Sequence, residues 1–384
     1  MKQRRLGVYV MIDALGFRFL REHEFMPELE FRVGLRTVLG YSCACQPTIF
    51  TGRLPHDHGH GAMFQRANGS TPLAAAKRYS WLPKAIADNY RIRNRIYGKV
   101  STQIDGYFSL YEVPTQLMPE FDLVEHKSIY EPRSMRRGTN IFDRFEEVGL
   151  RYRHYYWKTP EEQNLLNAED DLRSGRVEML FLYLPALDGL LHEHGSQGNA
   201  VHAHLRWYEE RLRRLRAIAE DVSEELEFFV FSDHGMSDVH GAVDVITPLE
   251  REFGPNGKRY LAFYDSTMAR FWSEDDALLD EIRSFLADRR DGRVIHDDEK
   301  AEIGIAFEDR SQGDVHFVVN EGLLIVPSYM GRTMLAGMHG YHPDAVDADA
   351  CLLGNFSPSQ DPVHIRHVYD LMNSTAGRLI EERV

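Results

Sequence analysis

The sequence predicts an α/β fold with a mainly parallel central sheet flanked by helices, and two kinds of pattern lead to this prediction. The first is a set of short apolar runs with the length of buried strands: Gly7 to Ile12, Arg95 to Val100, Glu178 to Leu184, Glu227 to Ser232, Tyr260 to Trp272 and Val315 to Val319. The second is the amphipathic helical spacing in Val201 to Glu225, Asp276 to Arg289 and Val363 to Glu382. Strands that alternate with helices favour a parallel sheet, whose functional residues gather at the carboxyl ends of the strands.

No linker, low-complexity segment or internal repeat divides the chain. We therefore expect a single domain over residues 1–384. Two insertions, near 100–175 and 240–335, are expected to cap its functional site.

The charge balance limits the partners. The chain has 59 acidic against 45 basic residues, a net charge of -14, which repels a phosphate backbone and argues against long nucleic acids. A small phosphate compound stays possible, because a few local cations reverse the field at a site. The oligomeric state is left open, a homodimer included.

Several features favour a cytoplasmic protein with no membrane partner. The basic start is followed by an apolar run that is short and ends at Asp13 without a cleavage pattern. No stretch reaches the roughly 18 apolar residues of a membrane helix. Cys43, Cys45 and Cys351 are too few for a disulfide framework, and reduced thiols fit the cytoplasm.

Three of the expected strands run directly into an aspartate. Asp13, Asp188 and Asp233 each follow such a run, so all three carboxylates are expected at one edge of the sheet. One such aspartate alone would commonly be a helix cap or turn residue. Three converging carboxylates repel one another unless cations lie between them, which predicts a metal site.

Histidines accompany these aspartates at suitable spacings. Asp188 and His192 are four residues apart, so one helical turn directs both side chains to the same point. His234 follows Asp233 directly, and Gly235 is expected to permit the sharp turn that both need. His339 lies in a flexible Gly-Met-His-Gly segment, where a lone histidine would more often be an ordinary loop residue. A mixed Asp and His set suits zinc better than calcium or magnesium, with manganese or iron as substitutes.

Ser42 is the candidate nucleophile. It stands at the expected start of a helix that ends at Gly52, where free backbone N–H groups favour a bound anion. On this segment alone a simple serine N-cap is the favoured interpretation. Beside a metal site the hydroxyl would ionise readily and become a competent nucleophile.

These motifs together resemble those of the alkaline phosphatase superfamily, and within it the type I phosphodiesterase and nucleotide pyrophosphatase branch. The resemblance is carried, in order, by the strand that ends at Asp13, Ser42 before Thr51-Gly52, Asp188-Gly-Leu-Leu-His192, Ser232-Asp233-His234-Gly235 and Gly337-Met-His339-Gly-Tyr341. It implies an alkaline-phosphatase-like fold and two zinc ions. By position, one ion would bind Asp13, Ser42, Asp233 and His234, and the other Asp188, His192 and His339. Ser42 would be transiently phosphorylated or nucleotidylated.

The sequence departs from that branch at one position. An asparagine that contacts a phosphoryl oxygen in the family falls on Met63, which cannot donate this hydrogen bond. Asn68 could replace it after a loop shift, although Asn68-Gly69 reads more readily as a surface turn. Nucleotide preference is therefore open.

Other chemistry-bearing residues have simpler interpretations. In the histidine-rich stretch His56 to His60, His58 is expected to fix a turn rather than bind a third metal. Cys43 and Cys45 suggest a sulfatase, but the aligned position is Ser42 and no Cys-x-Pro-x-Arg pattern occurs. The remaining candidates are phosphate-binding cations that could equally be surface charges, and aromatic residues that could stack on a substrate or belong to the core: Arg53, Lys99 and Arg332, and Tyr107, Phe108, Tyr111, Tyr155, Tyr156 and Trp157.

The predicted function is hydrolysis of a small organic phosphate ester of the phosphodiesterase or pyrophosphatase type. Diesters are favoured because no arginine follows Ser42 at close range. The first alternative is a phosphomonoesterase on the same scaffold, in a biosynthetic pathway. The second is an inactive metal-binding recognition protein, although no ligand or nucleophile is missing.

Overall fold

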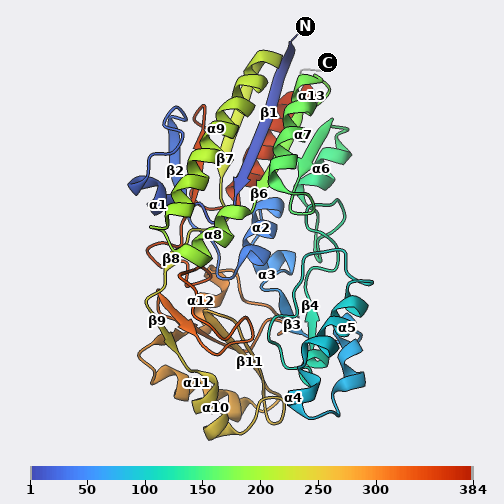
Figure 1. Ribbon diagram of the computed structural model, residues 1–384, viewed down its shortest axis with the longest axis vertical. Coiled ribbons are helices and arrows are strands. Elements are labelled where there is room, and N and C mark those ends of the chain that lie inside the picture. The colour runs from blue at the N-terminus through green and yellow to red at the C-terminus, as the bar shows by residue number, and fades with distance from the viewer. Residues whose placement is uncertain (1, 382–384) are drawn as a thin grey trace.

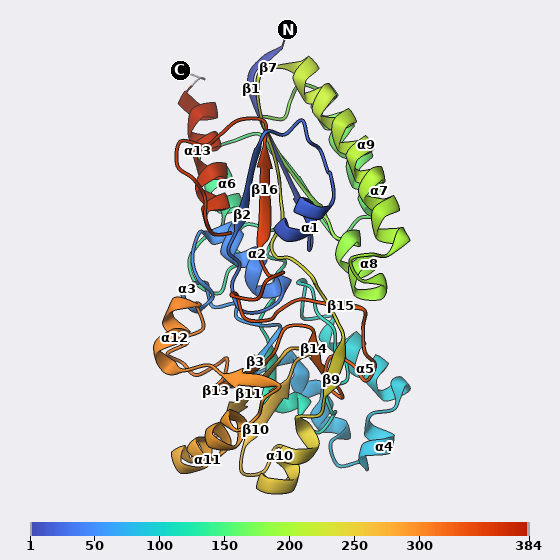
Figure 2. The ribbon, with the colours of Figure 1, turned by 90° about the vertical axis from the view of Figure 1, so that its left-hand side faces the viewer.

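A computed structural model describes residues 2–381, and its largest sheet has six strands in the order β2-β16-β7-β1-β6-β5 (Figures 1 and 2). Strands β5, β6, β1 and β7 are parallel, whereas β16 is antiparallel to both β7 and β2. Their bounds are β1 Gln3–Ile12, β2 Phe31–Leu35, β5 Tyr152–Tyr155, β6 Met179–Leu184, β7 Ser223–Phe231 and β16 Ala350–Gly354. The predicted α/β class with a mostly parallel sheet is confirmed.

Helices cover both faces of this sheet, which explains why β1 has no charged side chain from Leu6 to Ile12. Its even-numbered side chains from Leu6 to Ile12 pack against one helical layer, and Tyr9 and Met11 pack against the other. Figure 2 shows the two layers on opposite sides of the strands. The first layer has α1 Phe17–Glu22, α7 Glu161–Arg173, α8 Ala186–His194 and α9 Asn199–Val222; the second has α2 Ser42–Thr51, α6 Ile141–Glu147 and α13 His367–Glu381.

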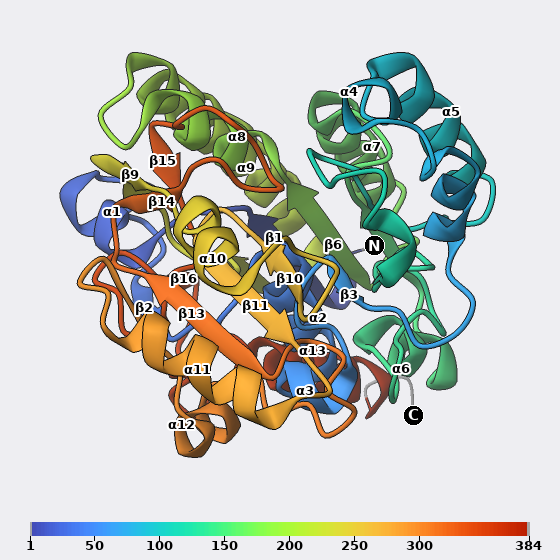
Figure 3. The ribbon, with the colours of Figure 1, turned by 90° about the horizontal axis from the view of Figure 1, so that it is seen from below.

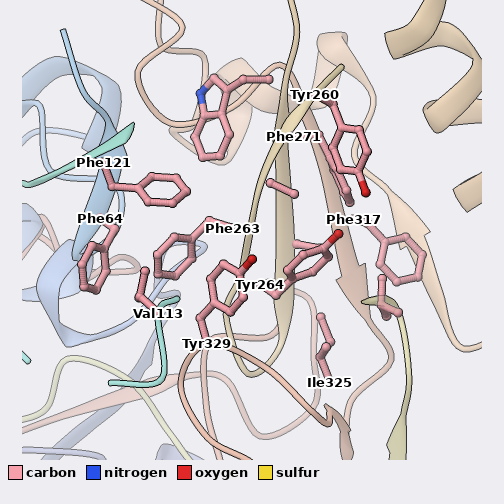
Figure 4. Packing of buried hydrophobic residues seen from close by; sticks show 14 of the residues in the cluster. Phe64, Val113, Phe121, Tyr260, Phe263, Tyr264, Phe271, Phe317, Ile325 and Tyr329 are labelled. Atoms are coloured by element: carbon pink, nitrogen blue, oxygen red, sulfur yellow. The ribbon is translucent and has the colours of Figure 1, made fainter. Parts of the chain in front are cut away.

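A second lobe lies beyond the carboxyl ends of the parallel strands (Figures 1 and 3). Its four-stranded sheet has the order β10-β11-β13-β12. The aromatic residues of these strands form a separate core, in which Phe263 packs against both Phe64 and Phe121 (Figure 4). The strands are β10 Leu261–Tyr264, β11 Met268–Trp272, β12 Gly292–Val294 and β13 Val315–Val319, with helices α10 Ile246–Phe253, α11 Asp276–Ala287 and α12 Asp297–Glu302.

Short elements complete the lobe and connect it to the central sheet. The paired strands are β3 Phe64–Arg66 with β4 Phe121–Leu123, β9 Gly241–Val243 with β14 Leu323–Ile325, and β8 Ser237–Asp238 with β15 Gly337–Met338. The helices are α3 Pro55–His58, α4 Lys84–Ala87, α5 Tyr90–Val100 and the 3-10 helices η1 Pro72–Tyr79 and η2 Met118–Glu120. None of the helices within residues 2–381 is both long and apolar enough to cross a bilayer.

Most predicted elements are present, with two differences. The strand predicted at Arg95 to Val100 is wrong, because this segment is the end of α5, whose buried residues Ile96 and Val100 are four positions apart. The Tyr260 to Trp272 run is two antiparallel strands, β10 and β11. The three predicted helices match α9, α11 and α13, and Glu382 lies outside the described residues.

The two predicted insertions contribute unequally to the lobes. Residues 240–335 form most of the second lobe, whereas 100–175 also supplies β5 to the central sheet and α6 and α7 to its faces. The division into one domain with two cap insertions stays a prediction.

Candidate active site

The ends of β1 and β7 bring the first set of candidate ligands together. Because the two strands are parallel neighbours with Met11 opposite Phe231, Asp13 emerges beside Asp233 and His234. One ligand atom from each of these three residues lies within 4.8 Å of the other two. His234 Nε2 is 3.3 Å from Asp13 Oδ1 and 3.6 Å from Asp233 Oδ2.

Gly235 was predicted to permit a sharp turn, but the structure shows a different reason for a glycine at this position. Its backbone is not in the left-handed region that only glycine favours. A Cβ there would instead lie 2.0 Å from the carbonyl oxygen of Asp347. The glycine is thus needed for the close approach of two backbone segments, not for a turn.

The second set of ligands comes from α8 and the segment after β15. Asp188 and His192 occupy successive turns of α8, and His192 Nε2 lies 3.3 Å from Asp188 Oδ1. His339 Nε2 lies 3.5 Å from the same oxygen. Asp188, His234 and His339 form a second group of ligand atoms within 4.8 Å of one another, and the His234 and His339 rings stack at 3.7 Å. The two sets therefore adjoin at His234.

Ser42 lies beside both sets, at the first position of α2. Its Oγ is 3.1 Å from His234 Nε2. The N-cap residue is Tyr41, and no side chain caps this helix, so the interpretation of Ser42 as a serine N-cap is wrong. The left-handed Gly52 ends the helix as predicted. The seven residues singled out from the sequence are thus brought to one place: Asp13, Ser42, Asp188, His192, Asp233, His234 and His339.

The carboxylates at this site are paired with imidazoles and with no lysine or arginine of residues 2–381. Within the described residues, the ion pairs of Asp13, Asp188 and Asp233 involve only histidines. Burial, together with the charges of Asp233 and Asp188, raises the pKa of Asp13 well above its usual range. Burial alone also raises the pKa of Asp188, but His192, His339 and His234 outweigh it and hold this pKa below the usual range. Burial and the charge of His234 lower the pKa of His339 well below its ordinary value.

Two carboxylate oxygens at this site have no hydrogen-bond donor among residues 2–381. Asp13 Oδ1 and Asp188 Oδ1 are buried and accept no hydrogen bond from that part of the chain. A buried, unsatisfied carboxylate oxygen is costly. Oxygen and imidazole nitrogen atoms gathered around such oxygens form the donor set of a divalent transition metal. The residues therefore fit metal binding.

A supporting set of hydrogen bonds, which sequence reasoning missed, holds Asp13 Oδ2 and Asp233 Oδ2. Tyr183 donates its hydroxyl to Asp13 Oδ2. Gln46 Nε2 donates to Asp233 Oδ2 at 3.1 Å and contacts the Tyr183 hydroxyl at 3.2 Å. Gln46 stands one turn after Ser42 on α2, which was the only sequence signal for it. Such partners orient metal ligands and set their affinity.

The site opens into a cavity of about 410 Å³ between the two lobes. Tyr107, Tyr111 and Trp157 line it, together with Met63, the residue that replaces the expected asparagine. Asn68 is exposed beside the left-handed Gly69, as expected of a surface turn. The other proposed aromatic contacts lie outside the cavity: Phe108 is in the core, Tyr155 donates to Asp171 and Tyr156 to Glu131.

The remaining candidates have structural or surface roles. His58 is fully buried, with Nε2 3.1 Å from Thr48 Oγ1 and Nδ1 accepting from the His60 amide, so it fixes the turn as predicted. Cys43 lines the cavity, and none of the described cysteines forms a disulfide. The cations proposed as phosphate contacts are not among the residues that line the cavity: Arg53, Lys99 and Arg332.

Fold and site together define a hydrolase of phosphoric esters from the alkaline phosphatase superfamily. Residues 37–342, most of the chain, match the family described as type I phosphodiesterase / nucleotide pyrophosphatase, and the chain belongs to this family. Metal dependence is typical of its members. No curated protein sequence matches the chain.

Solved structures share the fold along almost the whole chain. Human ectonucleotide pyrophosphatase / phosphodiesterase 5 is 15% identical, with a TM-score of 0.69 over 98% of this chain and 95% of that one. An inactive variant of the murine protein in complex with AMP has 15% identity and a TM-score of 0.67, with the same coverage. Phosphonoacetate hydrolase from Sinorhizobium meliloti 1021, in complex with phosphonoformate, has 13% identity and a TM-score of 0.68 over 97% and 96%.

Proposed function

We propose that the protein hydrolyses a small organic phosphodiester or pyrophosphate with Ser42 as its covalent nucleophile and two zinc ions as cofactors. The supporting observation is the convergence of a hydroxyl and six acidic or imidazole side chains at one end of the central sheet. They come from segments spread over most of the chain, and the acidic members lack basic partners within the described residues.

The order of the family motifs suggests how the ions would be divided, since His234 belongs to both groups of close ligand atoms. Asp13, Ser42, Asp233 and His234 would hold one ion, and Asp188, His192 and His339 the other. When bound, such ions stabilise negative charge on phosphoryl oxygens and lower the pKa of a hydroxyl or water. Manganese or iron could occupy the same donors.

The residues of the chain would then carry out two displacements. Ser42 Oγ attacks phosphorus, the bond to the leaving alcohol or phosphate breaks, and a phosphoserine diester forms. Water then attacks the same phosphorus, the bond to Ser42 breaks, and the hydroxyl is restored. Each displacement inverts phosphorus, so the whole reaction retains its configuration. The first N–H groups of α2 lack acceptors within the helix and favour the bound anion.

A diester or pyrophosphate is favoured over a monoester by the charge of the cavity. No lysine or arginine among residues 2–381 lines it, whereas a dianionic monoester needs additional cations around it. We also propose that the two predicted insertions act as the cap, because their residues Tyr107, Trp157, Asp265 and Met330 line the same cavity as Asp13, Asp188, His192 and His339.

The decisive experiment compares wild type and Ser42→Ala after zinc loading. Wild type should hydrolyse bis(4-nitrophenyl) phosphate faster than 4-nitrophenyl phosphate. Ser42→Ala should lose turnover by on the order of 10⁴-fold or more and keep most of its zinc in elemental analysis, since six ligands remain. Full activity in the variant would exclude Ser42 as nucleophile, and no turnover by wild type would favour the recognition protein.

A further inference from the structure

Besides the metal ligands, the cavity lining combines aromatic rings with carboxylates. We call Tyr107, Tyr111, Glu125, Trp157 and Asp265 the acidic aromatic wall; all five line the cavity. The charged members of this wall are both acids. With no lysine or arginine lining the cavity in the part of the chain that the structure describes, this wall presents net negative charge to a ligand.

Glu125 is the unusual member of the wall because half of its carboxylate is unpartnered. The residue is only 8% exposed. Its Oε1 accepts hydrogen bonds from the amides of Tyr107, at 3.0 Å, and Ile129, at 3.2 Å. No donor to Oε2 and no ion pair of Glu125 occurs among the described residues. Burial of an ionised carboxylate without a counter-ion is unfavourable, so this site gains stability from an added cation.

Asp265 differs, because a basic side chain accompanies it. Arg270 Nε donates to Asp265 Oδ2 at 3.1 Å, and the same guanidinium donates to Phe64 O and Gln312 Oε1. The guanidinium is thus turned to the protein interior, and it compensates one of the two acids.

Both acids act close to the nucleophile. Burial and then the charges of Asp265 and Glu125 raise the pKa of the Cys43 thiol to about 12. Since Ser42 and Cys43 line the same cavity as Glu125 and Asp265, a group bound beside these carboxylates would belong to the same small molecule as the phosphate under attack.

The aromatic residues of the wall suit the methyl groups of an organic cation. Tyr107 and Trp157 meet edge to face with centroids 5.7 Å apart. Lys158 Nζ already lies 5.8 Å from the Trp157 ring centroid, outside the cavity lining, where it pairs with Asp105. Aromatic faces next to a carboxylate are the recognition chemistry of alkylammonium groups, because ring quadrupoles and the anion both attract the cation while the rings cover its methyl groups.

We propose that the acidic aromatic wall binds a positively charged organic group, an alkylammonium or quaternary ammonium, on the alcohol part of the substrate. The substrates of the proposed reaction would then be zwitterionic phosphodiesters, so this inference rests on the proposed function. Nucleotides with further phosphates are disfavoured, since their extra anions would face Glu125 and Asp265.

Binding of choline, compared with its neutral isostere 3,3-dimethylbutan-1-ol, tests the proposal without any turnover. Titration of the zinc-loaded protein, followed by tryptophan fluorescence and calorimetry, should give at least tenfold tighter binding of choline. Glu125→Gln should remove this preference, because glutamine keeps the acceptor for the two amides but not the charge. Tyr107→Leu, at a half-exposed side chain, should weaken choline binding as a second variant. Glu120→Gln, an exposed acid of the same segment, should bind choline like wild type.

Choline affinity should also follow the ionisation of Glu125. Burial raises the pKa of Glu125 to about 7. The amides of Tyr107 and Ile129 and the charge of Lys158 lower this pKa by smaller amounts, and the charge of Asp105 raises it slightly. Affinity in wild type should therefore increase as pH rises from 6 to 8, and it should be flat in Glu125→Gln. The cavity thiol and phenols nearby have pKa values raised beyond this interval: Cys43, Tyr107 and Tyr111.

Turnover separates this inference from the proposed function. The ratio of kcat/KM for 4-nitrophenyl phosphocholine to that for bis(4-nitrophenyl) phosphate should fall at least tenfold in Glu125→Gln. Choline binding that depends on Glu125, in a protein that hydrolyses neither ester, would support the wall and refute the proposed function. Two outcomes would refute the proposed role of the acidic aromatic wall and leave the proposed function standing. One is diester hydrolysis by a protein that binds choline and its isostere equally. The other is displacement of choline-type substrates by AMP, with no effect of Glu125→Gln.

Discussion

The two ends of the central sheet both bury acidic side chains, but only one end balances them with basic residues. At the amino-terminal end, Glu227 is 3% exposed and accepts hydrogen bonds from Arg378 at 2.6 and 2.7 Å, from Arg5 at 2.9 Å and from Thr375. Burial raises the pKa of Glu227, yet these partners outweigh it and hold the pKa below its usual range. At the carboxyl end, no lysine or arginine of residues 2–381 pairs with Asp13, and burial and the charges of Asp233 and Asp188 raise its pKa.

This contrast teaches that charge compensation, not hollow space, marks the functional end. The amino-terminal end borders a larger cavity, of about 960 Å³, which Glu227, Arg5 and Arg378 line. Its buried acid, Glu227, is satisfied by Arg5, Arg378 and Thr375, and neither candidate metal-binding group of the described residues lies there. The smaller cavity at the carboxyl end is lined by Asp13 and Asp188, whose Oδ1 atoms have no hydrogen-bond donor among residues 2–381.

The largest effect on zinc content and activity is expected from Asp188→Ala, at the carboxyl end of the sheet. The variant should lose one of two zinc ions per chain and at least about 10³-fold in kcat/KM, because a two-metal clamp needs both ions. Elemental analysis and hydrolysis of bis(4-nitrophenyl) phosphate measure both quantities. Glu193→Ala is the matched control, since Glu193 lies on the same helix with a 74% exposed side chain. Unchanged zinc content in Asp188→Ala would contradict the ligand assignment.

The next largest effect is expected at the amino-terminal end of the sheet, and it is a loss of folding stability. Glu227→Ala removes the acid between Arg5 and Arg378 and should lower the free energy of unfolding by roughly 3 kcal/mol, measured by urea denaturation. Zinc content should stay that of wild type, because the ligands are at the opposite end of the strands. Glu225→Ala, on the same strand with a 53% exposed side chain, should cost less than about 1 kcal/mol. Zinc loss in Glu227→Ala would show that the two ends are coupled.

The comparison also shows what sequence could and could not reveal. The position of Asp13 and Asp233 was predictable because buried parallel strands are recognisable as apolar runs and their carboxyl ends coincide. The helix at Arg95 to Val100 was not, since its charged exposed face and two buried residues resemble a short strand pattern as well as a helix. Tyr183, Gln46 and Glu125 were missed because hydrogen bonds and missing partners depend on which segments meet in space.

The third prediction extends the comparison to Glu125, whose pKa rises from its ordinary 4.5 to about 7 through burial. A carboxyl group with a raised pKa in the folded state contributes stability that is complete below the unfolded pKa and is lost as pH rises through the folded pKa. The free energy of unfolding of wild type, relative to Glu125→Gln, should therefore fall by about 3 kcal/mol between pH 4.5 and 8. Urea denaturation of both proteins at several pH values measures the difference. A constant difference would mean that Glu125 is already paired.

The smallest effects are expected when one tyrosine hydroxyl is removed at each end of the central sheet. Tyr183 donates to Asp13 Oδ2 at the carboxyl end, and Tyr9 bonds with Thr375 Oγ1 at 2.7 Å beside Glu227; both are buried tyrosines of the same sheet. Tyr183→Phe should weaken zinc binding about 10- to 100-fold, because Asp13 loses the partner that orients it, as measured by competition with a chelator. Tyr9→Phe should leave zinc affinity unchanged and lower the free energy of unfolding by about 1 kcal/mol. If both variants lost zinc affinity equally, the cause would be a general loss of stability of the sheet and not the missing contact with Asp13. A loss confined to Tyr183→Phe would tie the unbalanced carboxylates directly to the metal.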